Sequence, residues 1–506
     1  MLVPPRALTN RVFALLAPGI TLGFALALLA GCAYPERNRP AARISDRQGY
    51  QYHLLEPTGL EDTLVIVTAS GGGTRASALA LAVLKGLDRV ELAGGRTLAQ
   101  EVDLVSSVSG GSVTAGYFAF AGRDGFDALE RDFIRRDGMK PLLWGVLNPV
   151  GLVRYFAVPG PERIDLLIDY LNQQLFHDAT FQALIDRDTR PYLVLNAADM
   201  VEGVPFPFTQ RKLDLLCSDL AQIPLAEAVA ASAAFPVALS PVTLKNYSPC
   251  AAQKQPWPPS WVTNNLDPDG TPQRDGIWYA NPARATLGRV ENAYALGDVP
   301  GRDDDKLYVH LLDGGIADNL GIFEPYRMLT TQDALPSFLT RINRGDIKKL
   351  VFVAVNARSF ATSELDQERA TPGMIDMLMA SINAPIDRAT AGTAAQLREL
   401  LDNAFRQIIL ADPGKEQLFR DLAANTALIS IDFDAIVDSE CRRKFHAIPT
   451  SWALSKQQVD AVMAVGPALL GSDPAFADLQ RIVGGTLDAP LPSVAEACRL
   501  VDLAQQ

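Results

Sequence analysis

Histidine and cysteine are scarce in this chain of 506 residues. The four histidines, His53, His177, His310 and His446, are not clustered, and none of the five cysteines forms a C-x-x-C pair. Because a zinc site needs several such ligands at close spacing, we expect no metal site. A long basic run is also lacking and the formal net charge is −12, which argues against a nucleic-acid partner.

A long hydrophobic run occupies the N-terminus. Arg6 and Arg11 precede or open a mostly apolar stretch, and Leu29-Ala30-Gly31-Cys32 closes it. This pattern resembles a bacterial lipoprotein signal, in which the chain is cut before Cys32 and its thiol is lipidated. By analogy with sorting rules, Ala33 after the cysteine favours the outer membrane, facing the periplasm. An uncleaved membrane anchor is the alternative.

Four cysteines remain after the predicted cleavage. An exported compartment is oxidising, which favours disulfides, and four cysteines allow three pairings. We favour the pairs nearest in sequence, Cys217–Cys250 and Cys441–Cys498. Buried free thiols are the alternative.

Strand-like and helix-like stretches alternate along the chain. Residues 63–68 form a continuous apolar, β-branched run, and residues 75–90 follow with apolar positions at helical spacing. Residues 102–108 and 112–120 repeat this order. Further strands are expected at 192–197, 307–312 and 350–356. Alternating strands and helices predict an α/β fold with a mostly parallel central sheet.

Internal repeats are absent, and 48% of the residues are hydrophobic, enough for one or two large domains. Pro, Arg and Gln are frequent between Cys32 and the first strand, which suggests a polar tether. The C-terminal part shows helical stretches and few strand signals. We therefore divide the chain into a signal peptide (1–31), a tether (32–59), a main domain (60–360) with one long insertion (246–305), and a helical C-terminal region (361–506).

Three glycine clusters follow predicted strands. In the second cluster, Ser109 closes a strand and opens a helix rich in small residues, as a nucleophilic serine on a sharp turn does. Ser106 and Ser107 lie in the predicted strand and Ser112 in the predicted helix, so Ser109 is the best exposed. A simple turn is the alternative interpretation.

The first cluster consists of Gly71, Gly72 and Gly73. Without side chains, their N–H groups can converge on an anion, as an oxyanion hole or a phosphate loop does. The Walker pattern is absent, and serines close the second strand where a Rossmann fold would carry an acidic residue. Arg75 could bind a phosphate head group, pin the glycine loop or be a solvated surface residue.

The third cluster is Asp313-Gly314-Gly315, directly after the strand predicted at 307–312. The carboxyl ends of strands are where ligands bind in open α/β sheets, so Asp313 is a candidate general base. Partial burial would raise its pKa toward the useful range. A structural Asp-Gly turn is the alternative.

Together, five segments of the chain resemble the motifs of the patatin-like phospholipases, with a lean to the cytosolic phospholipase branch. Residues 70–75 are similar to the oxyanion motif, and residues 103–111 to the strand and nucleophile elbow. Residues 196–199, 231–236 and 313–319 are similar to A-T-D, A-S-x-A-x-P and D-G-G-x-x-x-N. Two departures are Ser107, which replaces the first elbow glycine, and Ala198, which replaces a threonine.

The resemblance implies a patatin-like three-layer sandwich and a lipid acyl hydrolase that needs no metal or cofactor. It implies Ser109 as nucleophile and Asp313 as base, without a histidine. The main-chain N–H groups of Gly71, Gly72, Gly73 and Gly110 would stabilise the oxyanion. Supporting positions are Arg75, Gly111, Gly314 and Gly315. The implied substrate is a lipid with a fatty acyl ester, reached at the membrane through the lipidated Cys32.

Two other functions compete with this interpretation. A Ser-Asp-His esterase would use His446, although its polar surroundings predict a surface residue. A non-catalytic envelope lipoprotein would bind lipid or protein without turnover. We expect His310, on the strand before Asp313, to be a core histidine or to lie behind the site.

An apolar and aromatic segment at 141–156 follows Arg135, Arg136 and Lys140. It could be an interfacial lid or a membrane-facing patch. A buried pair of helices is the alternative, and the apolar pattern favours it.

Overall fold

The computed structural model describes residues 35–504 except 46, 152–160, 237, 248–306, 331–337, 360–368, 370, 372, 374–376 and 378–392. The predicted signal peptide, Cys32, Cys250 and nearly all of the insertion therefore lie outside the described residues. Within the described ranges, no helix has both the length and the hydropathy needed to cross a bilayer.

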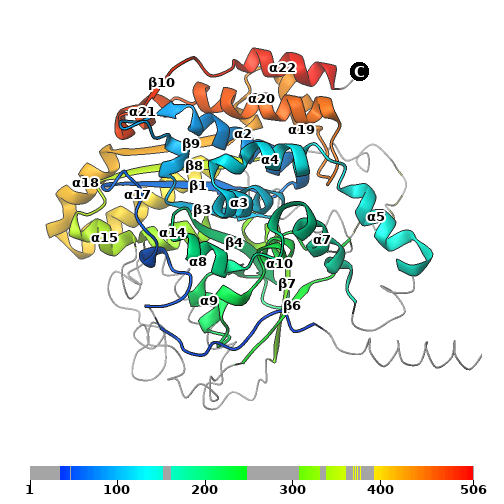
Figure 1. The fold of residues 1–506 in the computed structure, drawn as a ribbon. Coiled ribbons are helices and arrows are strands. Elements are labelled where there is room, and N and C mark those ends of the chain that lie inside the picture. Colours follow the sequence, from blue (N-terminus) through cyan, green and yellow to red (C-terminus); the bar gives the residue numbers. More distant parts are fainter. Residues whose placement is uncertain are drawn as a thin grey trace, which may run out of the picture.

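Eight strands form the central sheet: β1 Thr63–Ala69, β3 Leu104–Val108, β4 Tyr192–Asp199, β5 Pro205–Pro207, β6 Val242–Lys245, β7 Tyr308–Asp313, β8 Lys349–Asn356 and β9 Thr426–Asp432. Their order is β6-β7-β4-β3-β1-β8-β9, with β5 beside β4 (Figure 1). β1, β3, β4, β8 and β9 are parallel, whereas β7 is antiparallel to β4 and β6 is antiparallel to β7. The predicted fold, with a mostly parallel sheet, is confirmed.

The central strands were predicted correctly because they are buried on both faces. Every residue of β1 and β3 is buried, and a strand covered on both sides is a continuous apolar run rather than an alternating one. The expected strand bounds agree with β1, β4, β7 and β8 to within two residues. The short strands β5 and β6 and the edge strand β9 were not anticipated.

The described helices of this sandwich are α2 Gly73–Asp88, α3 Gly110–Ala121, α4 Phe126–Leu129, α5 Met139–Leu147, α7 Arg163–Leu171, α8 Phe181–Arg187, α9 Gln210–Asp214, α10 Leu225–Ser232, α13 Gly315–Asp318, α14 Phe323–Thr330, α15 Phe338–Arg344, α17 Thr393–Ala411, α18 Glu416–Ala424, α19 Ser439–His446, α20 Lys456–Ser472, α21 Phe476–Val483 and α22 Val494–Leu503. In Figure 1, α2, α20 and α22 lie above the sheet and α8 and α9 below it. α20 packs on α2, and α22 packs on α20. The sheet therefore lies between helical layers, and α22 adds an outer helix to one of them.

The described part of the predicted tether is folded against the domain. Arg37 is buried, and its guanidinium forms ion pairs with Glu162 and Asp165 at the start of α7 (2.7 and 2.6 Å). Tyr50 is also buried, and its ring stacks on Tyr192 of β4 with 4.9 Å between the ring centroids. The polar composition that suggested a tether therefore belongs to a packed segment whose buried arginine is paired with acids.

The C-terminal region is mostly helical, as predicted, but it also completes the sheet. β9 pairs in parallel with β8 over seven residues. α20 approaches α2 so closely that a Cβ added at Gly466 would lie 2.6 Å from the Cβ of Ala82. Because β9 and α20 share the core of the main domain, the region is an integral part of the fold.

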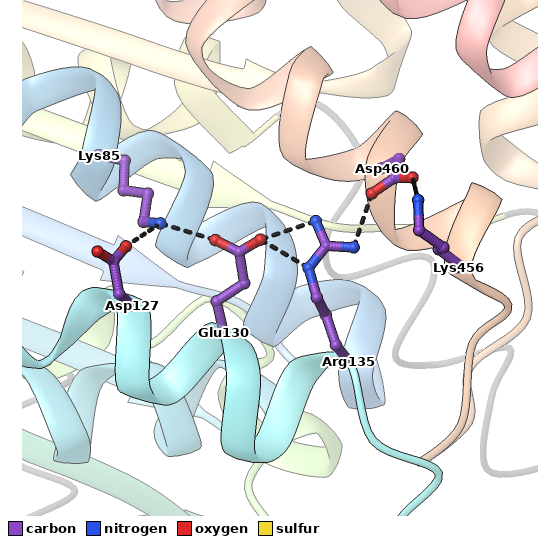
Figure 2. A network of polar contacts seen from close by, with 6 residues as sticks. All are labelled: Lys85, Asp127, Glu130, Arg135, Lys456 and Asp460. Carbon is purple, nitrogen blue, oxygen red and sulfur yellow. Dashed lines mark hydrogen bonds and ion pairs between the residues drawn. The ribbon is translucent and has the colours of Figure 1, made fainter.

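A ladder of ion pairs joins α2 to α20 (Figure 2). It passes through α4 and the π-helical turn Glu130–Ile134 that follows it, and the contacts are 2.7–2.9 Å long. The members are Lys85, Asp127, Glu130, Arg135, Asp460 and Lys456. An isolated exposed pair contributes about 0–1 kcal/mol, so the ladder fixes the relative position of these elements more than it adds stability.

The predicted Cys441–Cys498 disulfide is present and links α19 to α22. Cys217 is disulfide-bonded as well. Its predicted partner, Cys250, lies outside the described residues. The alternative of buried free thiols is therefore wrong for Cys217, Cys441 and Cys498.

Candidate active site

The strand register brings Ser109 and Asp313 together. Val108 of β3 pairs with Asn196 of β4, and the next residue of β4, Ala197, pairs with Asp313 at the end of β7. Ser109 directly follows Val108, so it reaches the same level of the sheet as Asp313. The Ser109 Oγ donates a hydrogen bond of 2.7 Å to Asp313 Oδ2.

The direction of β7 differs from the expectation behind Asp313. We expected a mostly parallel sheet, in which the carboxyl ends of the parallel strands meet at one edge. β7 is antiparallel to β4, but only its last three residues pair with the end of β4. This short overlap, rather than the parallel-strand rule, brings the Asp313 carboxylate to the serine.

Ser109 has the backbone of a nucleophile elbow. Its φ of 50° and ψ of −121° lie in a region that non-glycine residues rarely adopt. Such strain persists only where the surroundings enforce it, and it is common at functional sites. Here the Ser109 N–H donates to Ser232 Oγ at 2.9 Å, and α3 begins at the next residue. The hydroxyl is thereby held at the top of the turn.

The rival serines are occupied elsewhere. Ser106 Oγ donates to the Gly321 carbonyl, and the hydroxyls of Ser107 and Ser112 are 3.1 Å apart and hydrogen-bonded. Ser107, which replaces the first glycine of the elbow, thus fits within β3 without preventing the turn.

Close backbone packing requires glycine at Gly110, which was predicted for the oxyanion hole, and at two of the predicted supporting positions, Gly111 and Gly314. A Cβ at Gly110 would lie 2.0 Å from the carbonyl oxygen of Gly73, and one at Gly314 would lie 2.0 Å from that of Asn196. At Gly111 it would lie 2.5 Å from the Ser70 carbonyl. These contacts bring the elbow, the glycine loop and the Asp313 turn together.

Burial raises the pKa of Asp313 to about 6, while the hydrogen bonds from the Ser109 hydroxyl and the Gly315 N–H act in the opposite direction. The Gly315 N–H lies 2.8 Å from Asp313 Oδ1. A carboxylate with this pKa is mostly ionised at neutral pH and is basic enough to accept a proton.

In the glycine loop, one main-chain N–H group is hydrogen-bonded within the protein and others have no described acceptor. The Gly71 N–H is directed at Asn319, with 3.1 Å to its carbonyl oxygen and 3.2 Å to its Oδ1. Among the residues that the structure describes, the N–H groups of Gly72, Gly73 and Gly110 have no acceptor. The last two lie against each other at the first residues of α2 and α3. This arrangement can receive a negatively charged oxygen.

Arg75 pins the glycine loop, which was one of the three predicted alternatives. The side chain is 2% exposed, so the solvated alternative is wrong. It donates to the carbonyls of Ala357 and Ile448 and to Thr450 Oγ1. These donors are directed at protein atoms, which leaves no support for head-group binding.

Several residues around the site were not anticipated as contributors. Ser232 holds the Ser109 N–H and donates its own proton to the Asn196 carbonyl at 2.6 Å. Asn319 holds the Gly71 N–H, and the carbonyl of Ser451, in the C-terminal region, accepts the Thr74 N–H at 2.8 Å. Ser232 and Asn319 lie in segments that carried the family resemblance, so a sequence pattern pointed to their neighbourhood. No sequence pattern indicated Ser451.

The histidines are bound to other partners. His446 is buried, contrary to the predicted surface position, and its Nε2 lies 2.9 Å from Asp434 Oδ1. His310 is half-buried, and its Nδ1 forms a hydrogen bond with Thr243 on the neighbouring strand β6. No described contact joins His446 to Asp313 or Ser109.

A sequence model of the family "Patatin-like phospholipase" matches residues 67–326, which is more than half of the chain. The chain belongs to the patatin-like phospholipase family. The five predicted motifs lie within or at the border of the matched range, and the family is one of lipid acyl hydrolases.

Among solved structures, this patatin-like phospholipase is similar to human GIVD cytosolic phospholipase A2, with 14% sequence identity and a TM-score of 0.29. The match covers 63% of this chain and 50% of that chain, so it spans about half of the human protein's length. No curated protein matches the chain significantly.

Two acidic residues of the family-like motifs are structural in this patatin-like phospholipase. Asp103 pairs with Arg190 and accepts the Val65 N–H, at the opposite end of β3 from Ser109. Asp199 caps the turn after β4 by accepting the N–H groups of Val201 and Glu202. Within the described residues, no group of His, Cys, Asp or Glu could hold a metal ion.

Proposed function

We propose that this protein is a lipid acyl hydrolase of the phospholipase or lysophospholipase type, with Ser109 as nucleophile and Asp313 as base. The observation that carries the proposal is the 2.7 Å hydrogen bond between Ser109 Oγ, on its strained turn, and Asp313 Oδ2. A serine directed at a buried carboxylate with a raised pKa is an activated nucleophile.

In the first half-reaction, Asp313 accepts the Ser109 proton while Ser109 Oγ attacks the carbonyl carbon of the ester. The tetrahedral intermediate collapses, the alcohol leaves with the proton from Asp313, and an acyl group remains on Ser109. In the second half, Asp313 takes a proton from water, the resulting hydroxide attacks the acyl group, and the fatty acid leaves as Ser109 regains its proton.

The oxyanion of each intermediate would be stabilised by main-chain N–H groups. The contacts favour Gly72, Gly73 and Gly110 for this task, because the Gly71 N–H is already directed at Asn319. Each such donor contributes about 3 kcal/mol to transition-state stabilisation where single donors have been removed. Gly71 is better described as the point where Asn319 holds the loop.

We also propose that the chain is lipidated at Cys32 and anchored in the bacterial envelope, in the outer membrane facing the periplasm. The support is the N-terminal sequence, together with the Cys441–Cys498 disulfide, which fits an oxidising compartment. Mass spectrometry of the mature protein tests this directly. A diacylglyceryl group at an N-terminal Cys32 is expected, and an unprocessed Met1 would contradict the proposal.

The catalytic proposal is tested with Ser109→Ala and Asp313→Asn on a panel of defined phospholipids, lysophospholipids and glycerides, and with a fluorophosphonate probe. Both substitutions should reduce hydrolysis by at least a thousand-fold, and the probe should label Ser109. The matched control is His446→Ala, which should keep activity, because His446 is bound to Asp434.

A folded wild type that is never labelled and hydrolyses no member of the panel would support a non-catalytic lipoprotein instead. Loss of activity in His446→Ala with an unchanged melting temperature would contradict the dyad.

A further inference from the structure

Helix α5 presents an exposed apolar surface. Leu143, Trp144 and Leu147 are 50%, 72% and 62% exposed, and Val150, just beyond the helix, is 74% exposed. We call these four residues the α5 patch. The predicted burial of this segment is therefore wrong for this side of its described part. Large exposed apolar groups gathered in one place mark a binding surface.

The other side of α5 is seated on the domain. Leu142 packs against the core, and Gly145 is so close to α7 that an added Cβ would lie 2.7 Å from a Leu166 methyl carbon. The helix is thus fixed by one side, and the α5 patch faces away from the protein. In Figure 1, α5 projects from the edge of the molecule beside α7.

The charges beside the patch are balanced. Arg135 is held by Glu130 and Asp460 in the ladder of Figure 2. Arg136 pairs with Asp132 at 3.3 Å, and Lys140 pairs with Asp137 at 3.0 Å. Each of these cations has an acidic partner, although Asp132 also pairs with Arg131 at 2.6 Å. The positive charge of the segment is therefore largely neutralised, which leaves little of it for anionic lipid. Its chemistry, a tryptophan among aliphatic side chains, suits the interface of a neutral bilayer.

α5 also begins close to the glycine loop. The Gly138 N–H donates to the Trp452 carbonyl, and the carbonyl of the preceding residue, Ser451, accepts the Thr74 N–H. A Cβ at Gly73 would lie 2.5 Å from that same Ser451 oxygen. Direct contacts therefore connect the start of the helix to the loop that would hold the oxyanion.

The N-terminal segment leads to the same end of the domain. Arg37 is buried against Glu162 and Asp165 in the first turn of α7, the helix on which α5 rests. Arg37 lies five positions after Cys32, and an extended chain of five steps spans at most about 18 Å. If Cys32 is lipidated as proposed, the bilayer lies within about that distance of the Arg37 backbone, whose side chain contacts α7.

We propose that the α5 patch inserts into the surface of a neutral phospholipid bilayer and seats the active site on its substrate. This inference rests on the proposed lipid hydrolase function and names where that enzyme meets its substrate. Insertion is apolar, and it does not require anionic lipid.

The test reconstitutes the full chain in phosphatidylcholine vesicles and compares wild type with a Trp144→Ser/Leu147→Ser variant. The control is Val437→Ser, which removes a 93% exposed valine elsewhere on the surface. Two substrates are used, the phosphatidylcholine of the vesicles and a soluble monomeric ester, p-nitrophenyl butyrate. The double variant should lose at least ten-fold of the vesicle activity and keep the soluble-ester kcat/KM within two-fold. The control should keep both.

Insertion is also measured without activity, by quenching of tryptophan emission with brominated phosphatidylcholine. Wild type should be quenched more than Trp144→Phe, by the same amount with or without added phosphatidylglycerol. Equal quenching of the two proteins, or quenching only with anionic lipid, would overturn the inference. So would unchanged vesicle activity in the double variant, or an equal loss on both substrates. A wild type that hydrolyses neither substrate but shows Trp144 quenching would refute the hydrolase and leave the membrane contact standing.

Discussion

The Asp313 carboxyl group is buried but accepts hydrogen bonds from Ser109 and Gly315. Burial disfavours its charged form, so its pKa is raised to about 6. The residue must be ionised to accept the serine proton. In the proposed hydrolase, we therefore expect its titration to set the acidic side of the activity profile.

We expect kcat/KM to fall as the pH decreases through about 6, approaching ten-fold per pH unit below it, because the protonated acid cannot act as base. The measurement is the pH dependence of kcat/KM on a soluble ester. Asp313→Asn should show only a small residual rate that does not follow this titration. An acidic limb near 4 instead of 6 would mean that burial does not raise the pKa of the base, and a limb that persists in Asp313→Asn would mean that Asp313 is not the base.

At the same scale, Ser232 acts on Ser109 through the backbone. It accepts the Ser109 N–H and donates to the Asn196 carbonyl, so it fixes the strained turn. Ser232→Ala should leave that N–H unpaired at a cost of about 1–3 kcal/mol. We expect kcat to decrease about 10- to 100-fold with little change in KM, because the nucleophile is misplaced while the binding surface is kept.

The control for this positioning role is Ser106→Ala, which removes a buried hydroxyl that bonds Gly321 rather than Ser109. Ser232→Thr, which retains the hydroxyl, should restore part of kcat. A loss of melting temperature with unchanged kcat in Ser232→Ala would show that the hydroxyl only stabilises the fold.

Among the elements, the first turn of α2 depends on a segment far away in the sequence. Arg75 is bonded to carbonyls of Ala357 and Ile448, and the latter is 373 residues away. The side chain therefore couples the glycine loop to the end of β8 and to the segment after α19.

Replacing Arg75 by Ala should lower the free energy of unfolding by about 3 kcal/mol or more, since it leaves buried carbonyls unpaired. Activity at temperatures well below the transition should fall as well, because the oxyanion donors lose their support. Thermal unfolding and soluble-ester kinetics measure the two effects. Arg89→Ala is the matched control, as Arg89 also bonds carbonyls, those of Ala489 and Pro490, but at an exposed position.

Lys in place of Arg75 should not restore the wild-type values, because an ammonium group cannot span three acceptors in the geometry of a guanidinium. Wild-type stability and activity in both Arg75 variants would refute the pinning role.

At the scale of the whole molecule, the C-terminal region and the N-terminal segment close around the central sheet. β9 extends the sheet beside β8, and Arg37 attaches the N-terminal segment to α7. The Cys441–Cys498 disulfide joins α19 to α22 across a sequence separation of 57 residues.

Removing this disulfide by Cys441→Ala/Cys498→Ala should lower the free energy of unfolding by about 4 kcal/mol, the loop-closure value for a loop of this length, and by less if the native structure relaxes. Differential scanning fluorimetry with and without a reducing agent measures it. The reductant should lower the melting temperature of wild type more than that of the double variant, and an equal shift in both would contradict the prediction.

The local parts of the site were predictable from the sequence. Ser109 and Asp313 follow apolar, β-branched runs, and the glycines beside them mark turns where no Cβ fits. Periodicity reports how a segment is buried, so the central strands were found with small errors in their bounds. β9 was missed although its buried and half-buried residues alternate, as is typical of a strand at the edge of a sheet.

The exposure of α5 and the burial of His446 and Arg37 were not predictable in the same way. A short apolar helix has the same pattern whether it meets a core or a membrane. His446 and Arg37 lie in polar stretches of the sequence, and their burial depends on acidic partners. His446 is bound to Asp434, and Arg37 is paired with Glu162 and Asp165.

The sequence by itself determined the family, the strand–turn–helix units, the two residues of the proposed reactive pair and one disulfide. Backbone preference and apolar periodicity act over a few neighbouring residues. A short sequence motif therefore contains the information that they need. Only the tertiary structure decided that Ser109 meets Asp313, 204 residues away, through a short antiparallel overlap. It also decided which glycine N–H groups are left without a described hydrogen-bond acceptor and which side of α5 faces outward. These depend on strand register and on contacts between distant segments, which no local pattern encodes.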